Sequence, residues 1–102
     1  MTDEQLLAAV KTDNQIALEV TAYDERLSQM LDAAKAEIIA AGARTLDPYA
    51  SDRDAQLVIL YADWLWARRT AVLGSKDDPP MPRMVKLALN NRVFGEKAGA
   101  AT

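Results

Sequence analysis

The chain has 102 residues, enough for one domain with a single modest hydrophobic core. Half of its residues are hydrophobic and its formal net charge is −3, which disfavours both disorder and general nucleic-acid binding. It contains no His and no Cys, so disulfides, thiolate or imidazole catalysis and the common zinc sites are excluded. We therefore expect a protein that is not an enzyme, with no catalytic residue, no metal site and no cofactor.

The charge is unevenly distributed along the chain. Residues 1–56 carry eleven acids and five bases, whereas residues 57–102 carry four acids and seven bases. The net charges of the two parts are −6 and +3, and the basic part is suited to an acidic partner surface. The chain begins with acidic residues, unlike a secretory signal, and its longest apolar run, 57–62, is far shorter than the ~20 residues of a membrane span. We expect a soluble protein without a membrane partner.

The first segment, 2–11, has the pattern of a short helix. Thr2 and Gln5 stand at the spacing of a capping box, in which each side chain bonds the backbone of the other residue. The next segment, 12–20, contains one alternating apolar run, which cannot form a sheet by itself. We expect a largely extended connector that places its three alternating apolar side chains in the core: Ile16, Leu18 and Val20.

The segment 21–42 predicts a long amphipathic helix. Thr21 and Asp24 form a second possible capping box, and Gly42 is suited to end the helix because it tolerates a positive φ. The apolar side chains that recur at helical spacing should face the core, namely Leu27, Met30, Leu31, Ala34, Ile38 and Ala41. A connector over 43–50 follows, with two expected anchors, Leu46 and Tyr49.

The chain is organised around the segment 51–74, which predicts its most apolar helix. Ser51 is the expected N-cap, Asp54 would complete a third capping box, and Gly74 is the expected stop. Apolar residues cover most of the circumference, and the polar exceptions form one narrow stripe of Gln56, Asp63 and Thr70. Such a helix must be buried on nearly all sides. Because so short a chain has few other helices to bury it, we infer surplus apolar surface that a partner could cover.

Two features of this helix leave alternatives open. Asp63 lies in the most apolar part, where it either faces water along the polar stripe or pairs with a base of another helix or subunit. Trp64 and Trp66 point to different sides, so we expect one in the core and one at an interface. Arg68 and Arg69 are spaced to stack on the two rings. The alternative is two core tryptophans with solvated arginines.

The C-terminal part begins with a Pro-rich loop, 75–82. Its three closely spaced prolines predict a stiff extended strut. Pro82 should open a last helix that runs from Arg83 to about Arg92 and is ended by Asn90, Asn91 and Gly95. Residues 97–102, which are mostly small, predict a flexible tail.

The last helix has two interpretations. It carries the bases Arg83, Lys86 and Arg92 before its first acid, Glu96, and it places Phe94 near the chain end. These features favour a docking element for an acidic partner surface, held away from the bundle by the strut. The alternative is a helix that folds back onto the bundle, with Phe94 capping the core.

The elements together predict an all-α fold in a single domain, 1–102. We expect a small helical bundle with two long helices, near 22–42 and 51–74, that pack antiparallel, plus short N-terminal and C-terminal helices.

The order of these motifs resembles a known family. The segment 16–42 is similar to the entry and first long helix of the head–tail connector proteins of long-tailed bacteriophages, also called adaptor or head-completion proteins. The features that carry the resemblance are Thr21, Asp24, Glu25, Leu27, Leu31, Ala33, Ala34, Lys35 and Gly42. The second long helix, with Tyr61 and the Trp64-Leu-Trp66 segment, also looks like that family, and the resemblance covers residues 10 to 95. The capped N-terminal helix and the Pro-rich loop depart from the pattern.

The resemblance implies a structural virion protein in the neck, between the capsid portal and the tail. Such proteins form a ring of about a dozen copies that extends the DNA channel. The implied partners are further copies of the chain, the portal protein and the next neck or tail-completion protein, while DNA passes without sequence-specific binding. We assign the subunit or portal interface to Tyr61, Asp63, Trp66, Arg68, Arg69, Arg83, Lys86, Arg92 and Phe94.

The alternative function is a small helical nucleic-acid-binding protein, such as a phage regulator or packaging factor. It would use Arg83, Lys86 and Arg92 of the last helix as phosphate contacts. Steeply salt-dependent DNA affinity would favour this alternative, and assembly onto portal particles without DNA would favour the connector.

Overall fold

The part of the chain that the structure describes folds into four α-helices. A computed structural model describes residues 1–69 and 80–100, with side chains as far as residue 96. The helices are α1 (Asp3–Asp13), α2 (Asp24–Ala40), α3 (Asp52–Ala67) and α4 (Arg83–Ala100). The described residues contain no strand, which confirms the all-α prediction.

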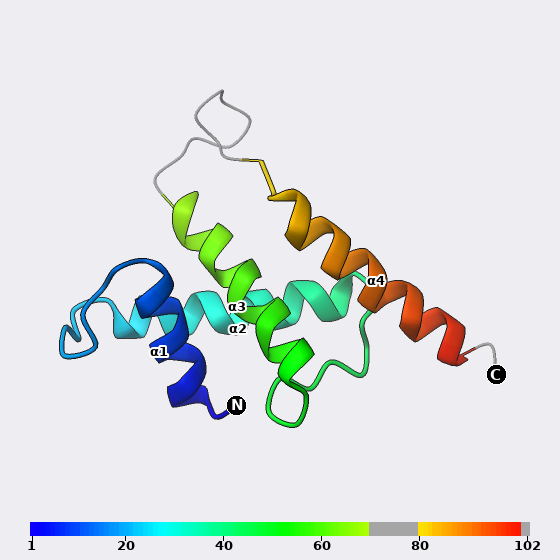
Figure 1. The fold of residues 1–102 in the computed structure, drawn as a ribbon, viewed down its shortest axis with the longest axis horizontal. Coiled ribbons are helices and arrows are strands. Elements are labelled where there is room, and N and C mark those ends of the chain that lie inside the picture. The colour runs from blue at the N-terminus through cyan, green and yellow to red at the C-terminus, as the bar shows by residue number, and fades with distance from the viewer. Residues whose placement is uncertain (70–79, 101–102) are drawn as a thin grey trace.

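The core lies where α2 and α3 cross. These two helices pack most closely together, and Figure 1 shows α3 running back across α2 at an incline. α1 packs against both of them, and α4 packs along the other side of α3. α3 supplies more buried side chains than any other helix, which confirms that the chain is organised around it: Asp54, Ala55, Leu57, Val58, Ile59, Tyr61, Ala62 and Trp66.

The predicted helix starts are confirmed at α1 and, in part, at α3. The Gln5 N–H donates to the Thr2 hydroxyl at 3.2 Å, and the Thr2 N–H donates to the Gln5 side chain at 2.9 Å. The Ser51 hydroxyl accepts from the Asp54 N–H at 3.2 Å. The Asp54 carboxylate, however, does not return to Ser51. It accepts from the Asp47 N–H instead, so the full capping box predicted there is wrong.

The predicted capping box at α2 is also wrong. α2 begins at Asp24, and its N-cap, Tyr23, makes no side-chain capping hydrogen bond. The Asp24 carboxylate is occupied by the Lys11 ammonium of α1, 2.8 Å away. The predicted stop is confirmed, because Gly42 follows the helix with φ +130°. A Cβ on Gly42 would also lie 2.9 Å from the Val93 side chain of α4, so glycine permits a close approach there.

The segment between α1 and α2 makes turns and is not largely extended. Ile16 packs against the core as expected. Leu18 and Val20 are 59% and 38% exposed, so their predicted place in the core is wrong. The physical reason is Lys11. Its side chain is buried, and its ammonium donates hydrogen bonds to the backbone carbonyls of Leu18 (2.9 Å) and Val20. The backbone carbonyls face inward, and the two side chains remain outside.

The connector between α2 and α3 has one of its two predicted anchors. Leu46 packs against the core. Tyr49 is half exposed, and its hydroxyl joins the connector to two helices. It donates to Asp3 at 2.8 Å and accepts from Lys35 at 2.9 Å.

The boundaries of the last two helices differ from the prediction. α3 ends at Ala67 with Arg68 as its C-cap; the expected stop at Gly74, the polar-stripe residue Thr70 and most of the Pro-rich strut lie outside the described residues. α4 begins after Pro82, as predicted. It continues through Asn90, Asn91 and Gly95 to Ala100. Asn and Gly have a low helix propensity, but the cost is too small to end a helix that packs on a neighbour. The tail predicted from residue 97 is therefore helical as far as Ala100.

Candidate functional site

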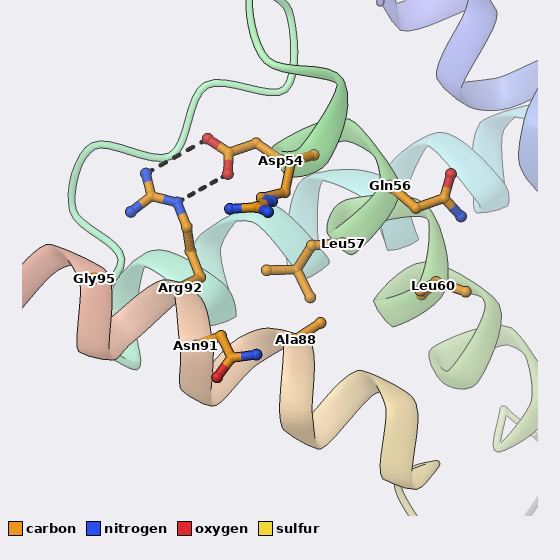
Figure 2. A pocket seen from close by; sticks show the side chains of 9 residues that line it. Asp54, Gln56, Leu57, Leu60, Ala88, Asn91, Arg92 and Gly95 are labelled. Carbon is orange, nitrogen blue, oxygen red and sulfur yellow. Dashed lines mark hydrogen bonds and ion pairs between the residues drawn. The ribbon is translucent and has the colours of Figure 1, made fainter.

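α4 is fixed to the bundle by an ion pair with the first turn of α3. Arg92 Nε donates to Asp54 Oδ1 at 2.8 Å, and Arg92 Nη2 lies 3.4 Å from Asp54 Oδ2 (Figure 2). Asp54 is only 5% exposed and also accepts from the Asp47 N–H at 2.9 Å. Burial by itself raises the pKa of Asp54, but the hydrogen bonds from Arg92 and Asp47 outweigh it, so the pKa lies below its ordinary value.

Arg92 has further partners on both sides. It donates to Glu96 at 3.0 Å, one turn along α4, and to the Thr45 hydroxyl at 2.9 Å, in the connector before α3. The hydrogen bond to Asp54, which has the largest effect, and the hydrogen bond to Glu96 hold the pKa of Arg92 above its ordinary value. Of the three bases expected to face a partner, Arg92 is thus engaged within the chain, whereas Arg83 and Lys86 are exposed.

An open groove of about 700 Å³ lies beside this ion pair, between α3 and α4. Leu57 and Leu60 of α3 and Ala88 of α4 give it an apolar floor (Figure 2). Gly95 lines the same groove, and a Cβ on it would meet nothing within 4 Å. The single carboxylate of the lining, Asp54, is neutralised by Arg92. The groove can therefore accept an apolar side chain but offers no pair of groups for acid–base catalysis.

The outer side of α4 carries an apolar surface of its own. Met84, Leu87 and Phe94 are 74%, 50% and 75% exposed, and their spacing puts them on one face of the helix. We call these three residues the α4 stripe. The opposite face packs on the bundle through Val85, Ala88, Leu89 and Val93. The fold-back interpretation is therefore confirmed for the helix but not for Phe94, which does not cap the core. α4 is not held away from the bundle, and its docking to a partner stays a prediction.

A second exposed apolar surface lies in the segment between α1 and α2. Leu18, Val20 and Tyr23 are all exposed there, and we call them the loop patch. The stripe and the patch hold six of the eight large hydrophobic side chains that are exposed in the described residues. Sequence reasoning missed the loop patch, because an alternating run gives no sign of which way its side chains face. The available signal was Lys11, a base near the end of an apolar helix face.

The tryptophans and arginines stack as predicted. The Arg68 guanidinium lies 4.5 Å from the centre of the Trp64 ring, and the Arg69 guanidinium lies 3.7 Å from the centre of the Trp66 ring. Trp66 is the more buried ring, and Tyr23 of the loop patch packs edge-on against it at 5.6 Å. Trp66 therefore belongs to the core of the single chain, and Trp64 is the more exposed of the two.

Tyr61 and Asp63 both lie at helix contacts inside the chain. Tyr61 is buried, and burial together with Glu37 raises the pKa of its hydroxyl. Asp63 is half buried, and it accepts a hydrogen bond from Asn14 at 3.1 Å. Burial and a hydrogen bond with a second acid, Asp13, raise the pKa of Asp63 to about 8. Asp63 therefore pairs with a second carboxyl group at the end of α1, so its predicted position facing open water is wrong, whereas a pairing with a base of another subunit stays a prediction.

The described residues contain no group of three or more side chains that could hold a metal ion. No helix in this part of the chain combines the length and the apolar character needed to cross a membrane. No protein-family model matches the chain, and neither the curated proteins nor the solved structures include a significant match.

Proposed function

We propose that this chain is a structural virion protein, the connector that forms a ring between the portal and the tail of a tailed bacteriophage. The observation that carries the proposal is the pair of exposed apolar surfaces, the α4 stripe and the loop patch, on one small all-α domain. Large exposed apolar side chains that gather on one face are candidate interaction sites. They give a physical basis to the sequence resemblance to head–tail connectors.

A ring requires two different faces on every copy. In a head-to-tail ring each copy presents one face to the copy before it and another face to the copy after it. The segment between α1 and α2, which carries the loop patch, and α4, which carries the stripe, lie on opposite sides of α3 (Figure 1). This arrangement supports a ring of about a dozen copies, as in the connector family, better than it supports a closed pair that uses one face.

The charge of the chain also suits a DNA channel. A net charge of −3 disfavours tight binding to phosphates, so DNA can slide past without being held. The proposed location is the neck of the virion, with the portal protein on one side and the next neck or tail-completion protein on the other.

The alternative, a nucleic-acid-binding regulator or packaging factor, is less well supported. It needed Arg83, Lys86 and Arg92 as phosphate contacts. Arg92 is occupied by Asp54 and Glu96, which leaves two of these three bases, Arg83 and Lys86, exposed. Two contacts give weak binding with a shallow dependence on salt.

The experiment that tests the connector proposal is deletion of the gene in the phage or prophage that encodes this chain. Lysates should then contain heads and free tails but few joined particles, and supplying the chain in trans should restore joining. Electron microscopy of portal-bearing heads mixed with the purified chain should show added ring density below the portal. Normal tailed particles without the chain would refute the proposal.

A further inference from the structure

We infer that the α4 stripe of one copy docks on the loop patch of a second copy of this chain, head to tail. The inference deepens the proposed connector function and rests on it for its setting in the virion. Three observations carry it: both surfaces are held in place, their charged borders are opposite, and they lie on different sides of the domain.

The loop patch is held in a fixed shape by Lys11. Its ammonium lies almost wholly inside the protein and bonds the carbonyls of Leu18 and Val20 and the carboxylate of Asp24. A buried charge with three acceptors is costly to displace. The exposure of the patch is thus part of the folded structure, and little ordering entropy remains to be lost when a partner covers it.

The α4 stripe is also held in place. Val85, on the opposite face, is 2% exposed, and Arg92 is paired with the buried Asp54. Both contacts fix the rotation of α4 about its own axis. Met84, Leu87 and Phe94 therefore remain on the outer face.

The charged borders of the two surfaces are complementary. Arg83 and Lys86 lie next to the stripe and are exposed. Glu19 stands between two residues of the loop patch and Glu25 follows it, and these two exposed acids outnumber the one exposed base of the segment 14–26, Arg26. Opposite charges around an apolar centre steer the correct faces together and disfavour stripe-to-stripe pairing, which would bring like charges together.

The two surfaces cannot meet within one chain, so a contact between them requires a second copy. In Figure 1 the loop between α1 and α2 lies on one side of the molecule and α4 on the other, with α3 between them. The same contact can be repeated from copy to copy, which is a heterologous interface. Three apolar side chains a side make a small interface, so we expect weak association in solution that strengthens when copies are held side by side.

The test is disulfide cross-linking, for which the chain is suited because it has no Cys. Two single variants, Leu18→Cys and Leu87→Cys, each place a thiol at an exposed position of one surface. One variant is labelled with ¹⁵N, so that a mixed dimer is recognised by its mass. Mixing them under a mild oxidant should give the mixed dimer as the main product, whereas each variant alone should dimerise little.

The matched control is Leu18→Cys mixed with Ile39→Cys, since Ile39 is also exposed but lies on α2, outside both surfaces. The inference is overturned if this control yields as much mixed dimer as the test pair. It is also overturned if Leu87→Cys alone dimerises as well as the mixture, because that result would indicate a stripe-to-stripe contact.

A charge exchange provides an independent test. Lys86→Glu in the Leu87→Cys variant should abolish the mixed dimer, and Glu19→Lys in the Leu18→Cys variant should restore it. Failure to restore it would contradict the pairing of the two oppositely charged borders. If cross-linking fails while deletion of the gene still yields unjoined heads and tails, the connector function stands and this interface is wrong. If cross-linking succeeds while joining is normal, the interface stands without the connector function.

Discussion

Arg92 of α4 and Asp54 in the first turn of α3 form a buried ion pair with Nε and Oδ1 2.8 Å apart. Lys11 of α1 and Asp24 in the first turn of α2 repeat the arrangement with a distance of 2.8 Å. In each case a base on an outer helix binds an acid at the start of a central helix, where a carboxylate is also favoured by the helix dipole.

The first prediction concerns the ion pair of α4. Arg92→Ala should destabilise the protein by about 3 kcal/mol, because it leaves the buried Asp54 carboxylate without its main partner. Urea unfolding measures the loss. The control is Arg83→Ala, an exposed base on the same helix, which should change stability by less than about 0.5 kcal/mol. Equal midpoints for the two variants would show that the pair is not important for stability.

The second prediction concerns the charged clamp of the loop patch. Lys11→Met should cost about 2 kcal/mol and free the carbonyls of Leu18 and Val20. The amide of Val20 should exchange faster with deuterium, because the turn that holds it opens. Lys86→Met, at an exposed position, is the control and should leave this exchange unchanged. Unchanged exchange in the Lys11 variant would mean that the turn is stable without the clamp.

The third prediction concerns the pH dependence that Asp63 confers. Its pKa is about 8 in the folded protein and 3.8 in the reference state, so the folded protein binds the proton more tightly. Stability from this group is therefore fully present below pH 3.8, falls as the pH rises and is lost above pH 8.

Asp63→Asn should consequently stabilise the protein at pH 8 and have no such effect at pH 4. Because Asp63 is only partly buried and solvent screens part of its charge, we expect a gain of about 1 kcal/mol, or about 4–8 °C in melting temperature. Melting curves at the two pH values measure it, with the exposed Asp32→Asn as control. A gain that is equal at both pH values would contradict a titrating Asp63.

The fourth prediction separates two leucines of the central helix. Leu57 is buried, and its replacement by Ala should lower the free energy of unfolding by about 2–5 kcal/mol. Leu65 is only partly buried, so Leu65→Ala should cost about 1 kcal/mol. The apolar pattern of the segment 51–74 does not separate the two positions, and denaturant unfolding of the two variants tests the difference that the structure gives them. Equal losses would indicate that Leu65 is more enclosed than its exposure suggests.

The fifth prediction gives two glycines opposite signs. Gly42→Ala should destabilise by about 1–3 kcal/mol, because φ is +130° and the new Cβ would meet Val93 at 2.9 Å. Gly95→Ala should stabilise by about 0.5–1 kcal/mol, because the position is helical and the Cβ meets nothing. Thermal unfolding of the two variants tests both signs. A loss at Gly95 would mean that the groove does not have room for a methyl group.

Local sequence signals predicted where helices start better than they predicted which side chains bind the acids at those starts. Thr2 and Ser51 act as caps because the groups that they bond are only three residues away. Asp24 and Asp54 fit the same rule but are used elsewhere, because Lys11 and Arg92 arrive from distant parts of the chain. A motif read over four residues contains no information about such a competitor.

The candidate surfaces were predictable to different degrees. Phe94 was recognised from the sequence as a large apolar residue without an evident place in the core, and it is exposed. Leu18 and Val20 were assigned to the core, because hydrophobicity alone argues for burial. Their exposure depends on hydrogen bonds of their own carbonyls, which side-chain patterns do not report.

The two ion pairs also bear on how the domain unfolds. α1 is joined to the α2–α3 pair by the ion pairs Lys11–Asp24 and Lys35–Asp3, and α4 is joined to it by Arg92–Asp54, each with a limited set of apolar residues, so α1 and α4 can open in separate steps. Opening of α4 would uncover Leu57 and Leu60 on α3 without disturbing the clamp of the loop patch. The domain thus has two local opening equilibria, and a neighbouring subunit that covers the α4 stripe would shift only one of them.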